Sequence, residues 1–181
     1  MQSKIDQLLA AYESVVNEPW ATSLSGHERI WFLVYDPAEQ RKVDLRIGDF
    51  ETIALRAQKK WVSISLKNCF PQWMSSHDYR EEYFQDPESL IDQLEAEFKQ
   101  FTIDYIITEL EKNKTADNTL IALREVSSLF GFTRMSDILS GCSGSFRGRL
   151  LLFFPGEYEK NQYRLLDARD GWNYLARPIT L

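Results

Sequence analysis

The sequence is poor in the residues that metal sites and disulfide scaffolds require. Its 181 residues include only two cysteines, two histidines, eight glycines and six prolines. A zinc site would need all four Cys and His residues, and none of them shows the short C-x-x-C or H-x-x-x-H spacing. Cys69 and Cys142 are far apart in the chain, so we expect two free thiols. The sequence therefore predicts no metal, no cofactor and no disulfide.

Long apolar runs and an export signal are also missing. The longest apolar run, residues 150–154, is far shorter than the roughly 18 residues needed to cross a bilayer. The N-terminal residues are polar and include an early acid, Asp6, without the basic start and apolar stretch of a signal peptide. We therefore expect a cytoplasmic protein that does not span or bind a membrane.

The motifs of nucleotide binding and nucleophilic catalysis are absent as well. No predicted strand leads into G-x-G-x-x-G or G-x-x-x-x-G-K-[ST], and the glycine-rich residues 141–149 precede a strand instead of opening a helix. There is no G-x-S-x-G, and His27 and His77 lie in polar stretches typical of surface turns. These absences argue against a nucleotide-dependent enzyme and against a serine or cysteine hydrolase.

Charge is unevenly distributed along the chain, whose formal net charge is −6. Residues 78–112 hold eleven acidic and three basic side chains, whereas residues 141–181 hold four acidic and six basic ones. Autonomous nucleic-acid binding needs an excess of Lys and Arg, so we do not expect it here. A local DNA contact within a complex, through Arg147, Arg149 and Arg177, stays open. We interpret residues 78–112 first as the solvated face of a helix and leave a docking role open.

The hydrophobic pattern predicts helices that alternate with strands. A first helix is expected to begin at a capping box formed by Ser3 and Asp6 and to end before Pro19. Further helices are expected over 37–57 and 87–110, each after an Asp-Pro cap, and in a short segment closed by Gly141. Strands are expected at 30–35, 61–66, 119–123 and 150–154, and residues 163–166 and 172–176 are expected to pair across Asp170-Gly171. Such alternation favours a parallel sheet. We therefore expect residues 1–181 to form a single three-layer α/β domain, with a mainly parallel sheet flanked by helices and a C-terminal antiparallel β element.

Carboxylates follow several of the predicted strands. Because the carboxyl ends of parallel strands meet at one edge of the sheet, these acids could hold Mg²⁺ between their oxygens. One hypothesis is therefore a metal-dependent enzyme acting on nucleic acid or phosphate esters through Asp36, Glu157, Asp167 and Asp170. The competing interpretation assigns Asp36 to a helix cap and the later acids to ion pairs with nearby arginines.

Residues 153–176 combine aromatic, arginine and acidic side chains at high density. Tyr, Trp and Arg dominate the energetics of protein interfaces because each offers a large contact area and a hydrogen-bonding end. The alternative is a hairpin whose Trp172 and Tyr174 pack inward on the protein itself. The candidate partner-binding residues are Tyr158, Arg164, Asp167, Arg169, Asp170, Trp172 and Tyr174.

The same stretch resembles the BrxB family of bacteriophage exclusion (BREX) systems. Two long motifs carry the resemblance: Gly-Arg-Leu-Leu-Leu-Phe-Phe-Pro-Gly-Glu-Tyr-Glu at 148–159 and Leu-Leu-Asp-Ala-Arg-Asp-Gly-Trp-Asn-Tyr-Leu-Ala at 165–176. Shorter segments at 18–20, 30–37, 73–74, 79–84 and 128–132 are similar to the family in the same order.

The resemblance implies a role in defence against phage, encoded beside a large ATPase, a DNA methyltransferase and the phosphatase-fold protein PglZ. It supplies no catalytic residues. We therefore expect a non-catalytic interaction or assembly subunit that binds other BREX proteins, with PglZ as the expected partner.

Overall fold

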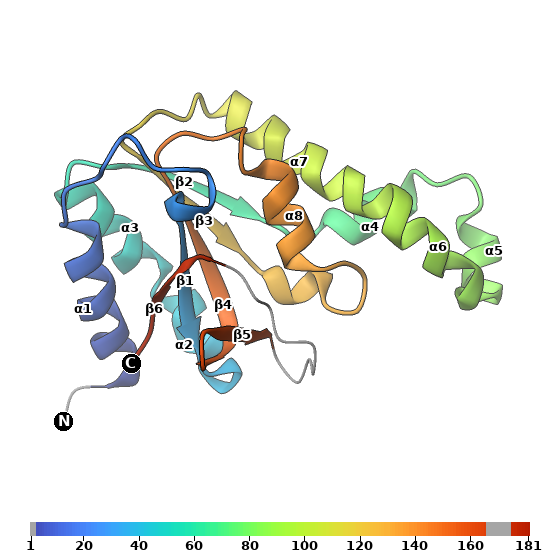
Figure 1. The fold of residues 1–181 in the computed structure, drawn as a ribbon. Coiled ribbons are helices and arrows are strands. Elements are labelled where there is room, and N and C mark those ends of the chain that lie inside the picture. The colour runs from blue at the N-terminus through green and yellow to red at the C-terminus, as the bar shows by residue number, and fades with distance from the viewer. Residues whose placement is uncertain (1–2, 166–174) are drawn as a thin grey trace.

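A mainly parallel β-sheet lies between two layers of helices in the computed structural model of the chain, which describes residues 3–165 and 175–181 (Figure 1). Within these residues the sheet has six strands: five in the order β2-β3-β4-β1-β6, with every neighbouring pair parallel, and β5, which pairs antiparallel with β4. This confirms the expected fold class, including the antiparallel element. The strands are β1 (Ile30–Tyr35), β2 (Lys60–Ser65), β3 (Thr119–Arg124), β4 (Arg149–Glu159), β5 (Gln162–Leu165) and β6 (Arg177–Ile179).

The alternation of side chains along the strands divides the core between the two faces of the sheet. In β1, for example, Trp31 and Leu33 point to one face, and Phe32 and Val34 point to the other. The first face is covered by α1 (Lys4–Val16), α2 (Gln40–Leu45) and α3 (Ile47–Arg56), and the second by α4 (Cys69–Ser75), α7 (Lys99–Lys112) and α8 (Met135–Cys142). No helix in the described part of the chain is long and apolar enough to cross a membrane.

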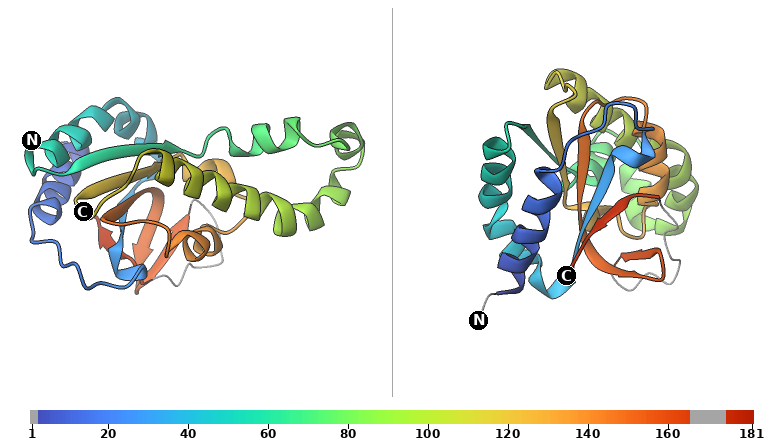
Figure 2. Two further views of the ribbon diagram at one scale, coloured as in Figure 1. Left: turned by 90° about the horizontal axis from the view of Figure 1, so that it is seen from above. Right: turned by 60° about the vertical axis from the view of Figure 1, so that its left-hand side comes forward.

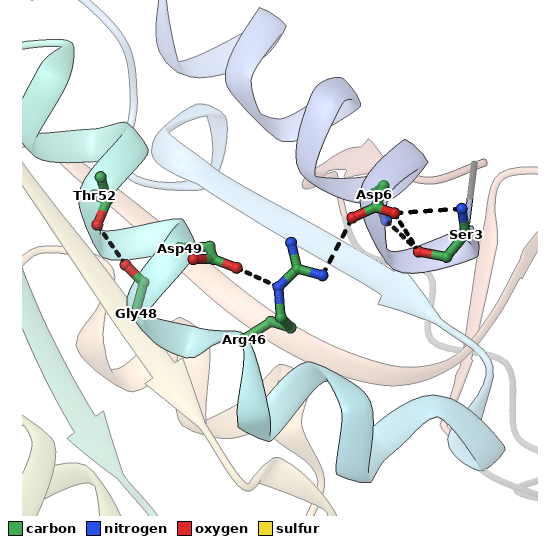
Figure 3. Close-up of polar contacts among 6 residues, drawn as sticks. All are labelled: Ser3, Asp6, Arg46, Gly48, Asp49 and Thr52. Carbon is green, nitrogen blue, oxygen red and sulfur yellow. Dashed lines mark hydrogen bonds and ion pairs between the residues drawn. The ribbon is translucent and has the colours of Figure 1, made fainter. Parts of the chain in front are cut away.

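The helix predicted over 37–57 is broken at Arg46, whose backbone leaves the helical region. A 3₁₀ turn (Pro37–Glu39) and α2 precede the break, and Gly48 lies inside α3 after it. The Arg46 guanidinium bonds Asp49 and, at 3.1 Å, Asp6 of α1 (Figure 3). Hydrogen bonds from Ser3, in the capping box that the sequence predicts, and from Arg46 lower the pKa of the Asp6 carboxyl. The break therefore links α1 to α3.

Helical structure continues from Pro87 to Lys112, as predicted, but it changes type along the way. A 3₁₀ turn (Pro87–Leu90), α6 (Ile91–Gln93) and a π-helical segment (Leu94–Phe98) lead into α7. The expected side-chain cap of Asp86 does not form. Together with α5 (Arg80–Gln85), the first turns extend beyond the sheet as a projection, seen in the left view of Figure 2. We call residues 76–97 the arm.

The C-terminal hairpin differs from the predicted one. β4 runs on past Phe154 through Pro155 and Gly156, and it turns at Lys160-Asn161 to pair with β5. The predicted partner of β5, residues 172–176, lies mostly outside the described residues, and Leu175 and Ala176 belong to no strand. Gly141, which was expected to close a helix, lies within α8.

The two cysteines are free, as predicted, and both are buried in the core layer covered by α4, α7 and α8. Burial raises the pKa of the Cys69 and Cys142 thiols to about 12, because it disfavours the charged thiolate. Since the thiolate is the reactive species, we expect neither thiol to react with iodoacetamide at about pH 8 in the native protein. Mass spectrometry is expected to show two labels only after denaturation, and native labelling of either residue would contradict the burial.

Candidate functional site

The neighbouring strands β1 and β4 send the chain to opposite faces of the sheet. After β1 the chain forms α2 and α3 on the first face, whereas after β4 the hairpin places Tyr163 and Leu165 in the core of the second face. In open α/β sheets, such a switch in direction opens a crevice outside the carboxyl ends of the two strands, and ligands bind there. The carboxyl ends of β1 and β4 are therefore the expected position of a binding site.

A cavity of about 590 Å³ lies at this position. Its lining has an apolar part, contributed by α1, β1, α2 and the last residues of the chain, and an acidic part at the strand ends. The apolar lining includes Ile5, Leu8, Val34, Val43 and Leu181, and the acidic lining consists of Asp36, Glu39, Glu157 and Glu159. Such a cavity suits a group with an apolar body and a polar end.

Most of the acids that line the cavity already have partners. Asp36 Oδ1 accepts a hydrogen bond of 2.9 Å from the Ala38 amide and so caps the 3₁₀ turn, as the competing interpretation proposed. Glu39 pairs with Lys42 at 2.9 Å, and Glu157 lies 3.8 Å from Arg164. Asp36 and Glu157 do line one cavity, as the carboxylate hypothesis requires. In residues 3–165 and 175–181, no group of three or more His, Cys, Asp or Glu side chains could hold a metal ion.

Two of the predicted partner-binding residues, Tyr158 and Arg164, lie on opposite faces of the β4–β5 hairpin. The half-buried Tyr158 ring packs 4.7 Å from the Tyr163 ring, and its hydroxyl donates a 3.0 Å hydrogen bond to Asn161. Arg164 is exposed on β5. Tyr163 is fully buried and donates to the Ala176 carbonyl at 2.5 Å, which ties the hairpin to the chain before β6. The other candidates lie outside the described residues: Asp167, Arg169, Asp170, Trp172 and Tyr174.

The three arginines considered for DNA contact do not form one basic surface. Arg149 is buried, donates to the carbonyls of Gly148 and Ala21 at 3.0 and 2.9 Å, and lies over the Trp20 ring. Arg177 forms a two-bond ion pair with Glu18, at 2.6 and 2.8 Å. Only Arg147 is both exposed and without an ion pair among the described residues. The placement of Arg149 on a DNA-binding surface was therefore wrong, because its guanidinium satisfies buried loop carbonyls.

A polar cluster that the sequence analysis overlooked lies at the carboxyl ends of β2 and β3. Ser65 donates to the carboxylate of Glu125, whose φ of 61° places it in the left-handed region. Arg124 Nε is buried without a hydrogen-bond partner among the described residues. Left-handed backbone at a non-glycine residue is strained and concentrates at functional sites. The signal in the sequence that could have indicated this cluster was the change from apolar to polar residues at the end of each predicted strand.

The described residues define a three-layer α/β protein whose candidate site lies at the switch point of a parallel sheet. A family model described as BREX protein BrxB matches residues 64–178 of the 181, and the chain belongs to this family. Membership makes the chain a component of a BREX phage-defence system. The match includes the arm and the β4–β5 hairpin, whereas the similar segments at 18–20 and 30–37 lie before it. No curated protein and no solved structure matched the chain.

Proposed function

We propose that this chain is a non-catalytic, cytoplasmic interaction subunit of a BREX system that binds other BREX proteins, PglZ first among them. Membership of the BrxB family supports the general role. The observation that carries the proposal is the partly apolar cavity at the ends of β1 and β4, which is bordered by a hairpin bearing Tyr158 and Arg164.

The arrangement around this cavity matches the anatomy of a protein interface. Interfaces commonly combine an apolar centre, which supplies most of the binding free energy, with a polar rim that adds specificity. Here the apolar lining would receive a side chain of the partner. Tyr158, which lines the cavity, and the exposed Arg164 would contact the surrounding surface.

Replacing Tyr158, Arg164 and Arg169 together with alanine tests the proposal. We expect recovery of the partner with tagged protein, from cells carrying the whole BREX locus, to fall by about tenfold or more, as expected for the loss of interface anchors. Quantitative mass spectrometry of the co-purified proteins measures the change. Arg41→Ala with Arg56→Ala, at two exposed positions on α2 and α3, is the matched control and is expected to leave recovery unchanged.

A folded triple variant with undiminished recovery of its partner would overturn the assignment of this surface. Circular dichroism establishes whether the variant is folded. If it is not, Arg164→Ala alone serves as the test, because this exposed side chain makes only a 3.8 Å ion pair with Glu157.

The second candidate function is a metal-dependent enzyme acting on nucleic acid or phosphate esters. It is favoured by one observation, the position of Asp36 and Glu157 on the same cavity. The first proposal predicts that the purified protein, incubated with DNA and Mg²⁺ or Mn²⁺, gives no more cleavage than a blank. Divalent-dependent cleavage that Asp36→Asn and Asp167→Asn both abolish would replace the first proposal with this one.

A further inference from the structure

No side chain of the arm, residues 76–97, is fully buried, and its Tyr83, Leu90 and Leu94 are half-buried against the core of the second face. α5 is a separate helix of six residues, whereas the turns from Pro87 onward continue without a break through the π-helical segment into α7. A helix as short as α5 is marginal in water, and packing of an apolar face supplies most of the stability of such helices. α5, which has no buried residue, therefore lacks the burial that would normally hold it.

Large apolar side chains are nevertheless present on the arm and point to solvent. Tyr79, Phe84 and Ile91 are 57%, 66% and 60% exposed. They are three of the eight large hydrophobic side chains that are exposed in the described part of the chain. The presence of three such side chains within one projecting segment favours a surface that another molecule covers.

The arm also carries a strong negative charge. From Asp78 to Glu97 there are eight acidic side chains and one basic side chain, Arg80. Glu81, Glu95 and Glu97 lie near basic groups, at 3.3 to 3.6 Å. The other acids pair with no basic side chain in the described residues: Asp78, Glu82, Asp86, Glu88 and Asp92.

We infer that the arm docks on another BREX protein, at an apolar depression rimmed by lysines and arginines that receives Phe84 and Ile91. This inference rests on the proposed function and specifies its partner chemistry. The uncompensated acids select a basic surface, since complementary charge promotes association and like charge opposes it. The same charge disfavours anionic lipid headgroups and nucleic-acid phosphates as the occupant.

The arm is a second contact, separate from the cavity. Figure 1 shows α5 on the opposite side of the molecule from α1, and α1 lines the cavity. The chain therefore offers two distant surfaces: an acidic arm with apolar anchors, and a partly apolar cavity beside a hairpin. Two such surfaces allow the subunit to bridge two partners or two parts of one partner.

Phe84→Ser combined with Ile91→Ser tests the anchors in the full chain. We expect at least about a tenfold loss of the arm's partner from the co-purified BREX proteins. Leu45→Ser with Leu55→Ser is the matched control, because these side chains are 78% and 54% exposed on α2 and α3, and it is expected to change nothing. The role of the negative charge is tested by the triple variant Glu82→Gln, Glu88→Gln and Asp92→Asn. This variant is expected to bind the arm's partner more weakly, and with less dependence on salt concentration.

Photo-crosslinking identifies the surface that the arm contacts. Benzoylphenylalanine at position 84 is expected to crosslink to a Lys- and Arg-rich segment of a BREX protein, whereas the same probe at position 45 is not. A crosslink to a second copy of this chain, a crosslink to a segment without basic residues, or no crosslink would overturn the inference. If the unmodified chain recovers BREX proteins but the serine variant recovers them equally, only the arm inference fails. If the unmodified chain recovers none, the proposed function fails as well.

Discussion

Replacing Phe32 with alanine is expected to lower the free energy of unfolding by about 4 kcal/mol, because truncating a buried phenylalanine removes apolar contact and leaves a cavity. Phe32 is fully buried in β1. Its ring centroid lies 5.2 Å from that of Phe154 and 4.3 Å from that of Tyr163. One side chain of β1 thus contacts both strands of the hairpin. Urea denaturation followed by tryptophan fluorescence measures the loss.

The control for this substitution is Phe84→Ala, which removes the same side chain from the exposed surface of the arm. It is expected to change the free energy of unfolding by no more than about 0.5 kcal/mol. A loss below about 1 kcal/mol for Phe32→Ala would contradict the packing of β1 against the hairpin. The Tyr163 ring packs against both Phe32 and the Tyr158 ring. We therefore also expect Phe32→Ala to weaken partner binding through the hairpin.

The parts of the fold that the sequence predicted are those encoded by local pattern. Residues 30–35 are apolar on both faces, and β1 is buried throughout because helices cover both sides of the sheet. The capping box at Ser3 and Asp6 could also be predicted from the sequence, because its two residues are three positions apart. The adjacency of Asp36 and Glu157 followed from a general rule, since acids after parallel strands meet at one edge of the sheet.

The parts that escaped prediction depend on contacts between distant residues. The break at Arg46 involves an ion pair with Asp6, 40 positions away, and Arg149 is buried because it bonds a carbonyl 128 positions away, that of Ala21. No local pattern reports either contact. The acidic run at 78–112 was expected to be the solvated face of a helix, which fits α7. It gave no sign that residues 76–97 would have no fully buried side chain, because charge counts do not show which residues have neighbours.

Gly156→Ala is expected to destabilise the protein by about 3 kcal/mol, at the upper end of the cost of overpacking. Gly156 lies opposite Leu165 in the hairpin. A Cβ atom there would lie 2.0 Å from the Arg164 carbonyl oxygen and 2.8 Å from the Phe154 ring. The nearer obstacle is backbone, which cannot rotate away as a side chain can, so β4 and β5 must separate. Thermal denaturation followed by circular dichroism measures the loss.

Gly48→Ala provides the matched control, because a Cβ atom on this helical glycine meets no atom within 4 Å. It is expected to leave stability unchanged or raise it by up to about 1 kcal/mol, since alanine favours the helix. Recovery of co-purified BREX proteins then distinguishes binding through the hairpin and cavity from binding through the arm. Gly156→Ala is expected to reduce contacts made through the hairpin and cavity, but to leave crosslinking from position 84 on the arm intact. Equal loss at both surfaces in a folded Gly156→Ala protein would show that the arm and the hairpin do not bind independently.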